Sequence, residues 1–259
     1  MGEPGDRRRE SEKKDFLSWQ VLLGLFLIIS SAFLYFLHYV IFRDVHHIFI
    51  YMVGDIAFVP IEVLLVTLII HRLLSEREKR AKLKKLKMLI GTLFSEVGTR
   101  LLTYFSDFDP DLEEIRKDLI VSAEWTEQDF SRVSTRLQNY DYGVAIKQMD
   151  LEELRKFLIG RRAFLVRLLE NPLLLEHESV TELLRAVFHL TEELEAREDV
   201  RQLPDSDYAH LAGDIERGYA LLVRQWLDYM AYLKDNYPYL FSLAMRTNPF
   251  DQTASVIVE

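Results

Sequence analysis

The stretch FLSWQVLLGLFLIISSAFLYFLHYVIF, residues 16–42, contains no charged residue over 27 positions. A hydrocarbon core about 30 Å thick is crossed by roughly 20 apolar residues of α-helix, so this stretch can span a bilayer with some tilt. Residues 48–70, IFIYMVGDIAFVPIEVLLVTLII, are nearly as apolar. Both stretches are longer than a buried soluble helix or the core of a signal peptide. We therefore predict two retained transmembrane helices.

The loop between the predicted spans is short. Only residues 43–47 separate them, which forces an antiparallel helical hairpin. Residues 1–15 carry five Lys or Arg, the loop carries one, and residues 72–87 carry eight. Because basic flanks stay on the cytoplasmic side, we expect an integral protein of the plasma or inner membrane with both termini in the cytoplasm.

Charge is unevenly distributed over the rest of the chain. Residues 72–87 hold eight basic and two acidic side chains, whereas residues 88–259 hold 18 basic and 31 acidic ones. Binding to nucleic acid is driven by Lys and Arg, so the acidic part argues against a nucleic-acid partner. Cysteine is absent, which excludes disulfides and thiolate metal sites.

The chain after the hairpin predicts an all-α bundle. Apolar residues recur at helical spacing over 150–170, 173–197 and 206–235, and no segment alternates as a strand does. Thr126 with Asp129 resembles a capping box that begins another helix. The predicted organisation is a disordered cytoplasmic tail (1–15), a transmembrane hairpin (16–71), a basic juxtamembrane helix or stalk (72–104), an acidic cytoplasmic helical domain (105–251) and a tail (252–259).

The predicted stalk has an apolar stripe with two interpretations. Its members alternate at spacings of three and four, which is the a/d pattern of a coiled coil. Two heptads fit equally well an amphipathic helix that packs on its own domain. The sequence leaves both interpretations open for Leu83, Leu86, Ile90, Leu93 and Val97.

Asp55 and Glu62 are the unusual residues of the second span. An acid near the bilayer centre costs about 2.5–3.5 kcal/mol, so such residues usually face protein or water. Their spacing of seven puts both on one helix face, and Pro60 between them frees a backbone carbonyl. Hydrogen bonding within or between hairpins is one explanation, and lining a pore is the other. On the first span, Tyr35 should lie at about the depth of Asp55, and Ser30 and Ser31 close to that of Glu62, so these three are the possible hydrogen-bond partners.

The segment around Asp55 also has a short resemblance. Residues 54–60, GDIAFVP, loosely resemble the pore motif Trp-Asp-x-x-Glu-Pro of the mitochondrial calcium uniporter family. The segment lacks the tryptophan, has Phe58 where the glutamate belongs, and shifts the proline by one position. The resemblance covers a handful of residues, and we do not infer membership from it.

Basic residues crowd the start of the predicted stalk. Each basic side chain near an anionic membrane surface contributes about 1 kcal/mol of attraction. The same residues also set the topology, so we expect contact with lipid headgroups without recognition of a particular lipid. These residues are Arg77, Lys79, Arg80, Lys82, Lys84, Lys85 and Lys87.

The common signatures of catalysis and nucleotide binding are missing. The sequence holds no G-x-G-x-x-G, G-x-x-x-x-G-K-[ST], G-x-S-x-G or H-E-x-x-H motif. His189 precedes Glu192 and Glu193, and His210 follows Asp207 and precedes Asp214, so histidine and acids lie at helical spacing in both places. Neither pair has the Glu-x-x-His form of a metal site in a helix bundle, and acids are abundant. We therefore expect solvated helix faces there, with no metal and no cofactor.

These features favour a non-enzymatic, membrane-anchored helical protein that acts as an oligomeric scaffold, sensor or accessory subunit. Its expected partners are the lipid bilayer, further copies of the chain and a protein bound by the acidic domain. The alternative is an oligomeric cation or proton channel that uses Asp55 and Glu62.

Overall fold

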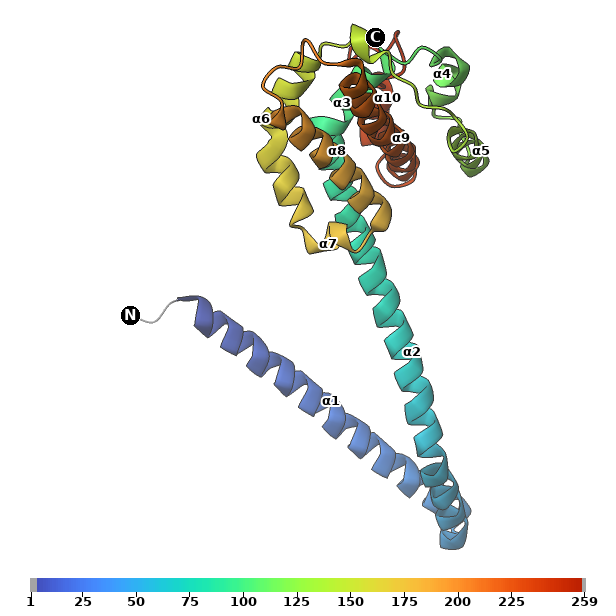
Figure 1. Ribbon diagram of the computed structural model, residues 1–259. Coiled ribbons are helices and arrows are strands. Elements are labelled where there is room, and N and C mark those ends of the chain that lie inside the picture. The colour runs from blue at the N-terminus through green and yellow to red at the C-terminus, as the bar shows by residue number, and fades with distance from the viewer. Residues whose placement is uncertain (1–3, 258–259) are drawn as a thin grey trace. The chain divides into compact units, whose positions relative to one another are not determined.

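The structure is a computed structural model that describes residues 4–257. All regular elements of these residues are helices, which confirms the predicted all-α class (Figure 1). The chain divides into two compact units, one ending at Glu76 and the other beginning at Arg77. The last two residues of the predicted tail, 258–259, lie outside the described part.

The first unit is built from α1 (Pro4–Phe42) and the first part of α2 (Val45–Leu93). The turn between them is two residues long instead of the five expected. Arg43 has a positive φ of 50°, and its N–H donates to the carbonyl of Tyr39, which ends α1. Asp44 Oδ1 accepts hydrogen bonds from the N–H groups of His46 and His47, which caps the start of α2.

The predicted disordered tail is different in the structure. Helix α1 begins at Pro4 and runs through residues 4–15 into the apolar stretch. A proline is well tolerated in the first turn of a helix, where its missing N–H would have no helical partner. After Gly5 the segment is dominated by Arg, Glu and Lys, which are good helix formers. The structure thus has helix over residues 4–15, where the sequence predicted a disordered tail.

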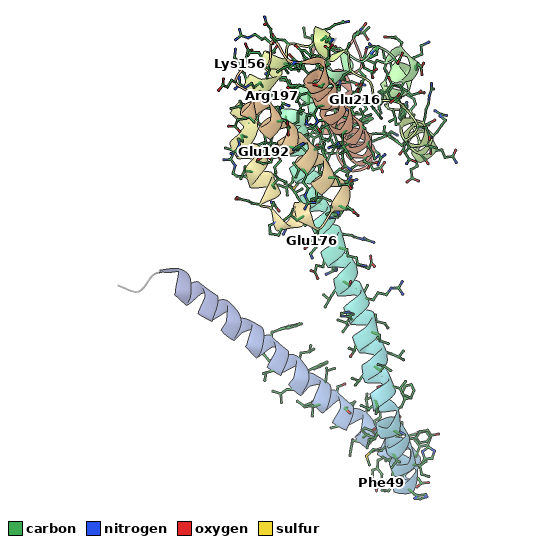
Figure 2. All side chains as sticks on the ribbon, in the orientation of Figure 1. Phe49, Lys156, Glu176, Glu192, Arg197 and Glu216 are labelled. Carbon is green, nitrogen blue, oxygen red and sulfur yellow. The ribbon has the colours of Figure 1, made fainter. Side chains whose placement is uncertain are left out.

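The apolar side chains of the first unit are exposed. Two helical segments are long and apolar enough to cross a membrane, Val21–Phe42 and a stretch within Val45–Ser106, and neither apolar window is buried. Phe49, in the second turn of α2, is 56% exposed (Figure 2). An apolar surface of this extent is not stable in water, so it requires a covering.

The second unit begins earlier than the sequence indicated. Leu86, Ile90 and Leu93 near the end of α2, and Val97 in the π-helical turn that follows, are all at most 3% exposed and belong to the hydrophobic core. The stripe of the predicted stalk therefore packs on its own domain. Only Leu83 is largely exposed, at 46%. A coiled coil through these positions would need the same faces that the core already covers.

The second unit is a bundle around one long helix. Helix α9 packs against α3, α5, α8 and α10, and α6 packs on α8 (Figure 1). Its elements after α2 are the π-helical turn η1 (Phe94–Gly98), α3 (Thr99–Ser106), α4 (Glu113–Leu119), α5 (Glu127–Leu137), the 3₁₀ turn η2 (Ile146–Gln148), α6 (Leu151–Leu169), α7 (Pro172–Leu175), α8 (Glu178–Ala196), α9 (Asp205–Asn236) and α10 (Pro238–Arg246).

Most predicted helices of this unit are present. Helices α6 and α9 match the expected ranges 150–170 and 206–235 to within one residue at each end. The capping box of α5 is formed, because Thr126 and Asp129 exchange both hydrogen bonds. The expected helix over 173–197 is instead divided into α7 and α8. The break lies at Glu176 and His177, where the carbonyl of Leu174 accepts from the N–H of His177 and from the buried hydroxyl of Thr181, both at 3.0 Å.

Candidate functional site

The acids of the hairpin lie in different surroundings. Asp55 lines a groove of about 540 Å³ between α1 and α2, together with Ser30, Ser31 and Tyr35. Glu62 does not line this groove and is exposed on α2, as is Pro60, around which the helix continues. We expected the two serines nearer to Glu62, and the structure places them with Asp55. Among the described residues neither acid makes a side-chain hydrogen bond.

The predicted lipid-binding residues all lie on the second half of α2. Five of the seven are exposed without an ion pair among the described residues, whereas Lys82 lies 3.6 Å from both Glu78 and Glu176. Lys87 is half-buried 5.6 Å from the ring centre of Tyr232, and burial lowers its pKa. Lys87 thus packs against its own helical domain.

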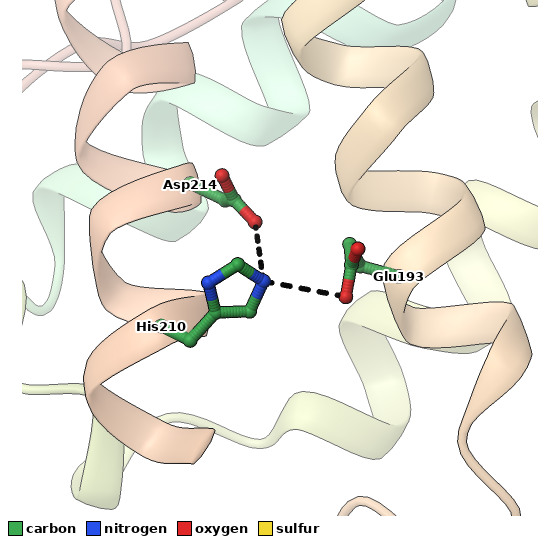
Figure 3. A group of neighbouring side chains, drawn as sticks. All are labelled: Glu193, His210 and Asp214. Carbon is green, nitrogen blue, oxygen red and sulfur yellow. Dashed lines mark ion pairs between the residues drawn. The ribbon is translucent and has the colours of Figure 1, made fainter. Parts of the chain in front are cut away.

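A cluster of histidines and acids lies where α8 and α9 pack together. His189 and Glu193 are one turn apart on α8, and His210 and Asp214 are one turn apart on α9. Because residues four apart share a helix face, each pair presents both side chains to the opposite helix. Residues 197–204 connect the two helices, which brings Glu193 next to His210 (Figure 3).

The donor atoms of this cluster are close to one another. Nε2 of His210 lies 3.5 Å from both Asp214 Oδ2 and Glu193 Oε2. Nε2 of His189 lies 3.5 Å from the same Asp214 oxygen and 3.7 Å from Glu193 Oε1. Burial is uneven: the Asp214 side chain is 4% exposed, whereas those of His189 and His210 are 46% and 52% exposed. The cluster is therefore buried on the side of Asp214 and open to solvent on the side of the two histidines.

Two arginines border the cluster. Arg197, at the C-terminal end of α8 (Figure 2), donates to Glu193 Oε2 at 2.8 Å and to both carboxylate oxygens of Asp207 at 2.6 and 2.8 Å. These hydrogen bonds lower the pKa of Glu193 and of Asp207 and raise that of Arg197. Arg217 donates to Asp214 Oδ1 at 3.3 Å. Each acid of the cluster thus has one oxygen held by an arginine.

This arrangement differs from the solvated helix faces that we expected. Glu193, His210 and Asp214 can each offer one donor atom such that the three lie within 4.8 Å of one another. Imidazole and carboxylate are metal ligands, so the packing of α8 on α9 joins two surface pairs into a group that could hold a metal ion. The spacing of four on each helix was visible in the sequence. The packing of α8 on α9, which joins the two pairs, was not.

A second groove, of about 600 Å³, lies in the helical domain. Residues of α2, η1, α9 and α10 line it, and much of this lining is aromatic or apolar. The Phe94 and Tyr229 rings are stacked on one side, with their centres 5.7 Å apart. Lining residues that reach solvent include Met88, Tyr239 and Leu243. Such a groove suits the apolar face of a partner helix.

The comparisons with known proteins divide the chain at nearly the same place as the structure does. Residues 12–74 match a family model described as "MJ1433, N-terminal helical domain", and residues 82–246 match "Uncharacterized protein MJ1433, C-terminal helical domain". The relative named "Uncharacterized protein MJ1433", from Methanocaldococcus jannaschii, is 47% identical over 241 residues, which cover 93% of this chain and 97% of the relative. No solved structure matches. With both domains matched, the chain belongs to the MJ1433 family.

Proposed function

We propose that this protein is a two-span membrane anchor that presents an acidic helical domain at the cytoplasmic face as a scaffold, sensor or accessory subunit. The observation that carries the proposal is the exposure of two long apolar helical segments, Val21–Phe42 and the apolar part of α2. Within the described part of the chain, no other residues bury their apolar side chains. A lipid bilayer is the covering that fits helices of this length and composition.

The charge distribution supports the same placement. The basic residues 72–87 directly follow the second apolar segment, and most of them are exposed. Basic residues at the end of a span stay on the cytoplasmic side and attract anionic headgroups. The acidic domain after them is repelled by the same surface. This combination keeps the domain available to protein partners, and its 600 Å³ groove is the place where a partner helix would dock.

The alternative of a cation or proton channel rests on the acids of the hairpin. Asp55 shares its groove with the hydroxyl groups of Ser30, Ser31 and Tyr35. Such hydroxyl groups suit either role, because they can donate hydrogen bonds to a carboxylate and can also line a pore. Glu62 lies outside this groove. Because only one of the two acids shares a polar surrounding, we favour a structural role for the pair within or between hairpins.

The topology is tested with single cysteines, for which the natural chain gives no background. Val45, Ser11 and Ser206 are each replaced by cysteine and exposed to a membrane-impermeant maleimide on intact cells. We expect only the cysteine at Val45, the first residue of α2 after the turn of the hairpin, to react. After permeabilisation all three should react, which is the control for accessibility.

Two outcomes would contradict the proposal. Labelling at Ser206 but not at Val45 on intact cells would reverse the orientation. Extraction of the protein from membranes by alkaline carbonate, which removes peripheral proteins and leaves spanning ones, would exclude the anchor itself.

A further inference from the structure

We propose that His189, Glu193, His210 and Asp214 bind one divalent first-row transition-metal ion, with zinc favoured, between α8 and α9. The inference concerns the helical domain alone and does not depend on its membrane anchor. Two imidazoles and two carboxylates, supplied in i, i+4 pairs from two packed helices, form a donor set of the kind that helix bundles use to hold such ions.

The first argument is the state of Asp214. Its side chain is 4% exposed, and among the described residues its Oδ2 has no hydrogen-bond partner, although two imidazole nitrogens lie 3.5 Å away. A buried carboxylate oxygen without a partner costs free energy, and native proteins rarely keep one without a reason. A metal ion bound by Oδ2 together with an imidazole nitrogen would give this oxygen a partner.

The second argument is the spacing of the donor atoms. Bonds of about 2.0–2.1 Å from zinc to nitrogen or oxygen, at tetrahedral angles, put neighbouring donors about 3.4 Å apart. The separations between Nε2 of either histidine and the acid oxygens are 3.5–3.7 Å. Hydrogen bonds between the same groups would be near 2.9 Å. These four histidine-to-acid separations are thus close to the edge length of a zinc tetrahedron and longer than ordinary hydrogen bonds.

The third argument is how the acids are held. Arg217 donates to Asp214 Oδ1 and leaves Oδ2 beside the histidines. Arg197 donates to Glu193 Oε2, which also lies 3.5 Å from His210, while Oε1 lies 3.7 Å from His189. Hydrogen bonds to the outer atoms of metal ligands orient them for binding. Glu193, His210 and Asp214 are the three closest ligands. His189 is the fourth, and its half-exposed ring has room to turn toward the ion.

The donor types select the ion. Imidazole nitrogen disfavours magnesium and calcium, which prefer oxygen ligands, and the absence of cysteine removes thiolate competition elsewhere in the chain. Zinc tolerates a four-coordinate site of nitrogen and oxygen with no further demand on geometry.

The test uses the full-length protein, purified in mild detergent without a polyhistidine tag and stripped with chelator. Zn²⁺ is titrated by calorimetry, and Co²⁺ is titrated by its visible absorption, which is intense only for four- or five-coordinate sites. We expect one ion per chain with a Kd of about 1 µM or tighter. His210→Gln and Asp214→Asn should each weaken binding at least about 100-fold.

The matched control is the double variant His46→Gln/His47→Gln, which removes two other histidines and should bind as the natural protein does. His210 is half-exposed and Asn preserves the shape of Asp214, so both variants should retain the natural helix content by circular dichroism. If either does not, His189→Gln is measured in its place with the same expectation. No saturable binding below 100 µM, on the order of 5 kcal/mol, or binding that His210→Gln leaves unchanged, would overturn the proposal.

Discussion

Single residues on α2 separate two interpretations of the hairpin. Asp55 shares a groove with Ser30, Ser31 and Tyr35, whereas Glu62, seven residues further along, lies exposed outside it. In a bilayer Glu62 would need a hydrogen-bonding partner from another copy of the chain. Replacing Glu62 should therefore leave cation flux unchanged if the acid is structural and reduce it if the acid lines a pore.

We expect Glu62→Gln to leave the stability of the detergent-solubilised protein unchanged or higher, because the amide keeps the size and most of the bonding capacity and removes the charge. Thermal unfolding measures this. Cation flux in proteoliposomes, at several pH values and voltages, should be the same for both proteins. Asp55→Asn is the parallel variant inside the groove. Flux through the natural protein that Glu62→Gln reduces would instead favour the channel.

At the scale of elements, the π-helical turn η1 depends on one close approach. A Cβ atom added at Gly98 would lie 2.6 Å from the ring of Phe94, which is 3% exposed, so this buried ring would have to shift. Gly160, in the exposed middle of α6, has no heavy atom within 4 Å of the same position. The two glycines therefore form a matched pair.

We expect Gly98→Ala to destabilise the protein by about 1–3 kcal/mol, the usual cost of overpacking a core. Gly160→Ala should stabilise it by about 0.5–1 kcal/mol, because alanine restricts the unfolded chain and suits a helix. Chemical denaturation followed by circular dichroism measures both. Equal effects of the same sign would mean that the Phe94 ring does not pack against Gly98 in solution.

At the scale of the whole molecule, the domain boundary decides which fragment folds. The core of the helical domain includes residues of α2, η1 and α3 that precede residue 105. We expect residues 77–259, expressed without the hairpin, to be soluble and helical with a cooperative melt. Residues 105–251, the domain expected from sequence, should aggregate or stay unfolded, because part of their core partner is missing. A cooperative melt of 105–251 would contradict this boundary.

The family matches agree with that division. One model ends at residue 74 and the next begins at 82, on either side of the boundary between the two units. Helix α2 continues through this point without a break. The helical pattern of the sequence therefore continues across the domain boundary. The burial of Leu86 and Ile90 shows where the second domain begins.

The sequence by itself determined what depends on local order: the all-α class, the two apolar segments, the helices α6 and α9 and the capping box at Thr126. Helical periodicity and capping are properties of neighbours in the chain, so they are visible without a fold. The single helix expected over 173–197 is divided into α7 and α8. The sequence also left two interpretations open for the stripe of the stalk, because the burial of Leu86 against its own domain depends on tertiary contacts.

Only the tertiary structure decided the candidate metal site. Each helix shows its own pair, His189 with Glu193 and His210 with Asp214, and each pair alone is an ordinary surface feature. The crossing of α8 and α9 buries Asp214 and brings all four side chains together. Ligand sets of this kind depend on which helix faces meet, and that is fixed by the packing of the whole core and not by spacing along one helix.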